Sequence, residues 1–156
     1  MGNRNARRFK SLLKQMKVIA HRGNINGPSE LENHPLHIRD VLKLGFDCEV
    51  DVWYKDGEYW LGHDEPTYDI SRGFLQNDKL WCHAKNLEAL EMMLECDIHC
   101  FWHEEDDFTL TSKRHIWTYP NKRLTENSIC VLPELGYNGE LKDCLGICSD
   151  FIEKYK

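Results

Sequence analysis

Two histidines and two carboxylates in the first half of the chain could together carry out acid–base and metal chemistry. They are His21, Glu49, Asp51 and His63, and each lies at or near the end of a stretch that is typical of a β-strand. Carboxylates bind divalent cations, and an imidazole with an ordinary pKa of about 6.5 can take or give a proton at neutral pH. Such a set could bind a cation and move protons on either side of a phosphorus atom, so a metal-assisted phosphodiesterase is the leading hypothesis.

The expected strand around the carboxylates places both of them on one face. Side chains two residues apart share a face of a strand, so Glu49 and Asp51 point the same way as Trp53. The opposite face is apolar and can pack under helices, and it consists of Cys48, Val50 and Val52. An alternative to a metal site is a strand with alternating charge at a solvated edge of the sheet. The apolar residues directly before both histidines argue against this alternative, because they indicate that the histidines also follow buried strands.

Further polar residues could assist the same chemistry. Arg22 offers a guanidinium fork for phosphate oxygens, and Lys85 could stabilise negative charge on a phosphate. His83 shares a strand face with Lys85. The acidic run at 103–107 is of a kind that is usually solvated, yet it follows the apolar residues 100–102. Its start is therefore expected at the carboxyl end of a strand, where the active sites of α/β proteins gather.

The charge of the chain is unevenly distributed. The net charge is −6, but residues 1–15 carry five basic side chains and no acidic one. The rest of the chain holds 15 basic and 26 acidic side chains. An acidic body argues against a nucleic-acid partner, because binding to phosphate backbones requires a basic surface. It suits a protein that collects carboxylates around a cation.

The cysteines and the hydropathy pattern indicate a cytoplasmic protein. The seven cysteines are an odd number and lie among apolar neighbours, and no secretory signal or membrane-length apolar run is present. Free thiols in a reducing compartment are the simplest explanation. The spacings Cys96-x3-Cys100 and Cys144-x3-Cys148 differ from the CxxC of common zinc sites. We therefore expect buried cysteines that act as small apolar residues.

The first fifteen residues are expected to form a basic tail ahead of one domain at 16–156. Phe9, Leu12, Leu13 and Met16 are spaced like one face of a short helix, which could make weak contact with an anionic membrane surface. A solvated tail, or a true start at Met16, are the alternatives. At 156 residues and 41% apolar content, the chain is long and apolar enough for one packed core.

Strand-like and helical segments alternate over the first hundred residues. Helices are expected from Pro35 to Leu44 and after the capping residue Asn86. Strands are expected at 18–20, 46–54, 58–63, 79–85, 98–103, 116–119, 129–132 and 146–152, with a hairpin turn at 55–57. This order predicts an α/β fold with mainly parallel strands.

The motifs around these residues resemble those of the glycerophosphodiester phosphodiesterase family, within the wider group of phosphatidylinositol-phospholipase-C-like phosphodiesterases. The resemblance rests, in order, on Ile19–Gly23, Glu32-Asn33, Glu49–Asp51, Lys55–Gly57 and His63-Asp64. Lys85, Trp117-Thr118 and Gly146–Asp150 are similar to later motifs of the family. The match is specific over the first seventy residues after Met16 and continues only in islands.

The resemblance implies a TIM-type barrel with its site at the carboxyl ends of the strands. A domain of about 140 residues falls short of the roughly 200 to 250 of a usual barrel, so it implies a reduced or compact one. Several helices would be missing or shortened, as the short spacer from Asp107 to His115 also indicates. The implied roles are His21 and His63 as acid/base pair, Glu49 and Asp51 as ligands of Mg²⁺ or Ca²⁺, Glu32 as a further candidate ligand, and Arg22 and Lys85 as phosphate contacts.

One position departs from the family pattern. His83 stands where the family has a third acidic metal ligand, two residues before the lysine. An imidazole ligand would shift the preference from Ca²⁺ toward Mn²⁺, Fe²⁺ or Zn²⁺. Alternatively Glu104 supplies the third carboxylate, or metal binding is lost.

The sequence thus predicts a metal-dependent hydrolase or lyase of a small glycerophosphodiester-like substrate. The alternative is a non-catalytic module that keeps the pocket and binds a phosphorylated sugar or lipid headgroup. A third interpretation is a structural α/β domain whose motifs are accidental.

Overall fold

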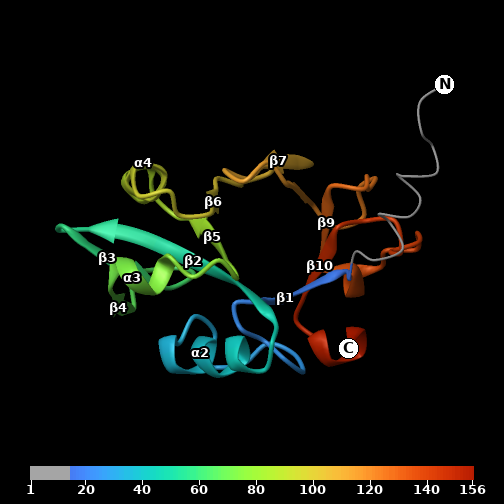
Figure 1. The fold of residues 1–156 in the computed structure, drawn as a ribbon, viewed down its shortest axis with the longest axis horizontal. Helices are drawn as coiled ribbons and strands as arrows, with labels where there is room; N and C mark the ends of the chain where they lie inside the picture. Colours follow the sequence, from blue (N-terminus) through green and yellow to red (C-terminus); the bar gives the residue numbers. More distant parts are fainter. Residues whose placement is uncertain (1–14) are drawn as a thin grey trace.

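A curled sheet of ten strands organises residues 15–156, which are the residues that this computed structural model describes (Figure 1). The strands are β1 Lys17–His21, β2 Asp47–Lys55, β3 Glu58–Leu61, β4 Tyr68–Ile70, β5 Leu80–Ala84, β6 Cys100–Phe101, β7 Phe108–Leu110, β8 Ile116–Thr118, β9 Ser128–Val131 and β10 Gly146–Ser149. Along the sheet they follow the order β4-β3-β2-β1-β10-β9-β8-β7, while β5 pairs with β2 and with β6.

The middle of the sheet is parallel and its outer parts are antiparallel. Strand β1 pairs in parallel with both β2 and β10, and β2 also pairs in parallel with β5. Strands β3 and β4 extend β2 as an antiparallel ribbon, and β7 pairs antiparallel with β8. The register places His21 opposite Glu49 and Asp51 opposite His83. Pairing of the backbone therefore brings polar residues of three strands to one region.

The prediction of a reduced or compact TIM-type barrel with mainly parallel strands is wrong. The sheet is mixed and is curled into a half-barrel, and few helices accompany it. The turn at Asp56 and Gly57, both with positive φ, returns the chain beside β2 as the antiparallel strand β3. The spacer before His115 holds the hairpin strand β7, not a lost helix. Within the described chain, the connections that follow β8 and β9 contain no α-helix, so these strands lack the covering layer that a barrel of alternating strands and helices requires.

Three α-helices and two short 3₁₀ segments complete the described structure. They are α2 Pro35–Lys43, α3 Arg72–Leu75, α4 Leu87–Glu95, η1 Pro133–Leu135 and η2 Ile152–Tyr155. Helix α4 begins as the sequence predicted, because the Asn86 side chain accepts a hydrogen bond from the Ala89 N–H. Proline is the first residue of α2, where its missing N–H costs no helical hydrogen bond. Helices α2 and α4 both lie outside the curl (Figure 1).

The two faces of the sheet carry separate apolar cores. The convex face packs under α2 and α4 with residues such as Val50, Ile38 and Met93. The concave face holds a second cluster, made of Ile19, Trp81, Phe101, Trp117, Ile129, Val131, Leu145 and Cys148. These side chains fill the inside of the curl below the carboxyl ends of β1, β2, β5 and β10. They provide an apolar floor for the polar residues at those ends.

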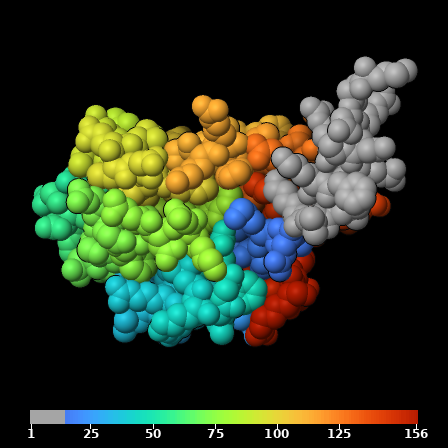
Figure 2. Space-filling model, in the orientation of Figure 1, coloured from blue at the N-terminus to red at the C-terminus, as the bar shows by residue number. Residues whose placement is uncertain are grey.

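The beginning and the end of the described chain lie side by side, since β1 pairs with β10 (Figure 2, blue beside red). The seven cysteines are free, and most of them are buried. Among the described helices, none has the length and apolar character needed to cross a bilayer. The predicted membrane contact of the basic tail falls on residues 1–14, outside the described part of the chain.

Candidate functional site

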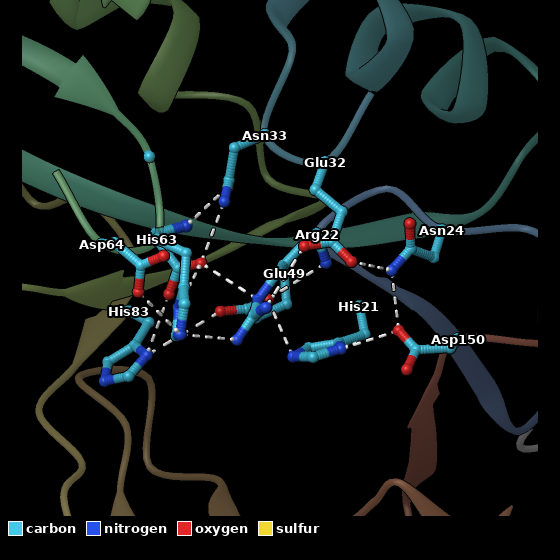
Figure 3. A network of polar contacts seen from close by, with 12 residues as sticks. His21, Arg22, Asn24, Glu32, Asn33, Glu49, His63, Asp64, His83 and Asp150 are labelled. Carbon is cyan, nitrogen blue, oxygen red and sulfur yellow. Dashed lines mark hydrogen bonds and ion pairs between the residues drawn. The ribbon is translucent and has the colours of Figure 1, made fainter. Parts of the chain in front are cut away.

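The carboxylate pair lies buried near the carboxyl end of the parallel part of β2. Glu49 and Asp51 are only 2% and 1% exposed, and they point to the concave face as the alternation along the strand predicted. A carboxylate removed from water is stable only when other groups replace its hydration. The surroundings of the pair supply such groups from several segments, which extend from His21 to Asp150 (Figure 3).

Asp51 is the more heavily compensated of the two acids. Asn33 binds it twice: its Nδ2 donates to Oδ2 at 2.9 Å, and its Oδ1 accepts the Asp51 backbone N–H at 2.9 Å. Nδ1 of His83 lies 3.2 Å from Oδ1, and Nδ1 of His63 lies 3.4 Å from Oδ2. Burial by itself raises the pKa of Asp51, but the contacts with the two histidines outweigh burial and hold the pKa well below its usual range. Asp51 therefore carries a negative charge at neutral pH.

Glu49 lies in a different electrostatic environment. Burial and the neighbouring charge of Asp51 raise its pKa above the ordinary value. The Arg22 backbone N–H donates to Oε2 at 3.1 Å, and Nε2 of His21 lies 3.9 Å from the same oxygen. Two buried carboxylates side by side repel one another, so a cation between them would stabilise both in the charged form.

His21 is held by a carboxylate at the far end of the chain. Its Nδ1–H donates to Oδ1 of Asp150 at 2.8 Å, and Nδ2 of Asn24 donates to that same oxygen at 2.8 Å. Burial lowers the pKa of His21, but the hydrogen bond with Asp150 and the charge of Glu49 raise it, with a net increase. Because Asp150 fixes Nδ1, the other ring nitrogen, Nε2, faces the carboxylate pair and is free to exchange a proton.

Arg22 lies at the centre of the group and links most of its members. Its backbone is left-handed, with φ 52°, which turns the side chain back over β2. Nη1 donates to Oε2 of Glu32 at 3.2 Å, Nη2 donates to Nε2 of His63 at 3.2 Å, and Nε lies 3.3 Å from Oδ2 of Asp51. Figure 3 shows the guanidinium and Glu49 between His63 and His21. Glu32 thus serves as a partner of the arginine and of Asn24, not as part of the closest carboxylate group.

His63 enters the group from the loop after β3. Its side chain is 40% exposed, so it forms the solvent-facing side of the group. Gly62 N–H donates to the Asp51 carbonyl at 3.1 Å, and the Trp53 indole donates to the Gly62 carbonyl at 2.7 Å. A Cβ at Gly62 would overlap the backbone carbonyl of Glu65, so only glycine fits this bend. The glycine therefore fixes where His63 leaves the sheet.

His83 completes the set that could hold a metal ion. One ligand atom from each of Glu49, Asp51 and His83 lies within 4.8 Å of the other two. Nε2 of His83 faces the His103 carbonyl at 3.0 Å, and a carbonyl only accepts, so Nε2 carries the hydrogen. Nδ1 faces Oδ1 of Asp51 at 3.2 Å, so the space between the two atoms holds either a second ring hydrogen, which stabilises the Asp51 charge, or a cation that takes its place. Two buried carboxylate oxygens and one imidazole nitrogen fit a divalent metal.

Two of the predicted residues lie outside this group. Glu104 is exposed on the loop after β6, on the wall of a shallow acidic hollow formed with Glu105 and Asp106. Lys85 follows β5 directly and donates its backbone N–H to the Val52 carbonyl. Within residues 15–156, its ammonium forms no ion pair, which leaves it available to an external anion.

Three residues of the network received no role from the sequence: Asn24, Asn33 and Asp150. Asn33 belongs to the Glu32-Asn33 motif, and Asp150 directly follows the last strand. Their positions next to motif residues or strand ends were the signals that could have identified them. The contacts they make, however, depend on folding: Asp150 is 129 residues from the histidine that it orients.

We compared the chain with protein-family profiles, with curated proteins and with solved structures, and none of them matches it.

Proposed function

We propose that the protein is a metal-dependent phosphodiester hydrolase or lyase that acts on a small glycerophosphodiester-like substrate. The observation that supports this most is the placement of two histidines around one buried carboxylate pair. Nε2 of His21 lies 3.9 Å from Glu49, and Nδ1 of His63 lies 3.4 Å from Asp51. A phosphate bound over the carboxylates would have an imidazole on each side.

The two histidines supply the proton transfers in this proposal. A hydroxyl of the substrate, or a water molecule, attacks phosphorus and gives its proton to one imidazole. The bond from phosphorus to the leaving oxygen breaks, and the other imidazole protonates that oxygen. Asp150 keeps the Nδ1 proton of His21 in place, so that the exchange occurs at Nε2. The hydrogen bond with Asp150 and the charge of Glu49 raise the pKa of His21, which stabilises the protonated imidazole that forms when His21 takes a proton.

Arg22 and Lys85 are the phosphate contacts. The arginine donates to Glu32 and to Nε2 of His63. Phosphate oxygens are stronger acceptors for these N–H groups than an imidazole nitrogen, so a bound phosphate would release Nε2 of His63 for proton transfer. Glu49, Asp51 and His83 would hold Mg²⁺, Ca²⁺ or Mn²⁺, which when bound offsets negative charge on the phosphoryl oxygens.

The second candidate is a non-catalytic module that binds a phosphorylated sugar or lipid headgroup. It is favoured by one observation, namely that the guanidinium of Arg22 already lies 3.3 Å from Asp51 and compensates its charge. A binding module needs Arg22 and Lys85 as phosphate contacts but requires no proton transfer.

The test measures turnover and bound metal in the same samples. The purified protein is given glycerophosphodiesters and a bis-aryl phosphodiester with Mg²⁺, Ca²⁺ or Mn²⁺, and ³¹P NMR separates a cyclic phosphate, the lyase product, from a monoester. We expect turnover that His21→Ala abolishes. His115→Ala is the matched control, because His115 is also half-buried with a hydrogen bond to a side chain, but its partners are Asn127 and the rings of Trp81 and His99.

Two results would contradict the proposal. Activity that survives His21→Ala would remove the acid–base role. Absence of turnover across the panel, with a metal ion confirmed in the protein, would favour the binding module instead.

A further inference from the structure

The metal-facing nitrogen of His83 is selected by a loop that itself contributes no ligand. Strand β6 ends at Phe101, and the chain beyond it leaves the sheet. The His103 carbonyl on this loop accepts from Nε2 of His83 at 3.0 Å. This hydrogen bond keeps a ring hydrogen on the side away from the carboxylates, so Nδ1 is the nitrogen that faces Glu49 and Asp51 and whose lone pair can bind a cation.

The ring of His83 is also fixed in orientation. It stacks on Phe101 with a centroid separation of 5.2 Å and an angle of 6° between the ring planes. The stacking favours an imidazole plane parallel to the Phe101 ring, and the hydrogen bond to the His103 carbonyl favours the edge with Nδ1 toward the carboxylates.

The carbonyl of His103 needs support of its own, since it lies beyond the last paired residue of β6. The support comes from within the loop. Nδ1–H of His103 donates to Oδ2 of Asp106 at 2.6 Å, and Thr109 Oγ1 donates to the Trp102 carbonyl at 2.7 Å. The first of these bonds ties residue 103 to the acidic run, which the sequence predicted to be solvated or to supply a ligand.

We propose that His103 and Asp106 are positioning residues of the metal site, and that they hold the loop carbonyl that presents Nδ1 of His83 to the cation. The inference rests on the proposed function, since it concerns the same carboxylates. In this role, the acidic run acts without direct contact with the metal or the substrate. The role uses only Nδ1 of the His103 ring, whereas acid–base catalysis by His103 would require a ring nitrogen that exchanges protons with the substrate.

The first experiment measures the dissociation constant of Mn²⁺ by the loss of the free-ion electron paramagnetic resonance signal. Removal of partners that orient a metal-ligating histidine typically weakens metal affinity by about 10- to 100-fold, and we expect this for His103→Leu and Asp106→Ala. His103→Asn keeps an N–H donor near the position of Nδ1 and should stay within about threefold of the natural protein. Asp107→Ala is the matched control, because this acid of the same run pairs with Lys122 instead.

The second experiment repeats Asp106→Ala in a His83→Asp background. An aspartate has no ring nitrogen to select, so a residue that acts through His83 should then change the Mn²⁺ affinity by less than about threefold. A loop that merely supports the fold would weaken binding equally in both backgrounds, and that outcome would overturn the inference. Equal losses of Mn²⁺ affinity in His103→Asn and His103→Leu would also overturn the inference, because they would indicate a direct role of the His103 imidazole.

A third measurement is made without metal. Nitrogen-15 chemical shifts of the His83 ring, followed to a pH at which the ring is neutral, should report hydrogen on Nε2 in the natural protein and loss of that preference in Asp106→Ala. If the natural protein binds no cation, the proposed function fails, and this measurement still decides whether the loop selects the ring nitrogen. If the cation binds but the ring nitrogens respond to none of the variants, only the further inference fails.

Discussion

Replacement of Asn33 by alanine should be among the most destabilising changes in the site, although the sequence assigned this residue no role. The side chain is buried and binds Asp51 twice, at 2.9 Å through each of its polar atoms. Alanine removes a hydrogen bond to a charged carboxylate, worth about 1.5 to 3 kcal/mol, and leaves the buried Asp51 N–H without its acceptor, at about 1 to 3 kcal/mol. Asn33 also has φ 59°, a region that costs alanine roughly 1 kcal/mol more than asparagine.

These contributions predict a loss of about 3.5 to 7 kcal/mol in the free energy of unfolding, measured by guanidinium denaturation. Asn121→Ala is the matched control, since Asn121 has φ 65° and a single exposed hydrogen bond to the Leu135 carbonyl. It should lose about 1 kcal/mol. Asn33→Gly separates the backbone from the side chain, because glycine accepts the left-handed conformation without strain. If Asn33→Ala is no less stable than Asn121→Ala, the compensation of Asp51 by this side chain is refuted.

Three further predictions follow from the same structure. Gly62→Ala should abolish metal-dependent turnover and lower the free energy of unfolding by several kcal/mol, because the new methyl group overlaps the backbone. Gly57→Ala is the control: this glycine has a positive φ but open space around it, so the change should lower the free energy of unfolding by about 1 kcal/mol and leave turnover unchanged. Burial lowers the pKa of His99 to about 4. Below about pH 6.5 the unfolded state therefore binds a proton at this histidine, whereas the folded state does not until the pH approaches 4. The contribution of His99 to the free energy of unfolding should therefore fall by about 2 kcal/mol between pH 7 and pH 5, measured as the difference between the natural protein and His99→Gln. Equal pH profiles of stability in the two proteins would contradict this. Asp150→Asn keeps the size of the partner of His21 but removes its charge, which lowers the pKa of His21. The limb of the pH–rate profile that belongs to His21 should therefore move to lower pH, and turnover should fall at least tenfold. A limb that does not move would exclude the pairing of His21 with Asp150.

Much of the local structure was predictable from the sequence. Apolar alternation identified the strand that carries Glu49 and Asp51 and placed both carboxylates on one face. Asn86 marked the beginning of α4, and the turn before Glu58 marked the return of the chain beside β2. These features depend on residues within a few positions of one another, through side-chain alternation, capping and turn geometry, so the sequence expresses them directly.

The arrangement of the sheet was not predictable in this way. Whether a strand adds in parallel or returns as a hairpin depends on the connection that follows it, and the sheet is a mixed half-barrel instead of the expected barrel. The three-residue strands β4 and β7 are too short to produce a clear period. They became strands because the neighbouring edges of β3 and β8 were available for pairing.

The sequence by itself determined the chemistry that the site can offer: two imidazoles, a carboxylate pair and an arginine, each placed at a strand end by local patterns. Tertiary structure alone decided which of them meet. Asp150 reaches His21 only because β1 pairs with β10, and His83 joins Asp51 because β5 lies in register beside β2, while Glu104 remains in solvent. The physical reason is that pairing across more than a hundred residues is selected by the packing of the whole sheet on its two apolar cores, and no short segment of the chain carries that information.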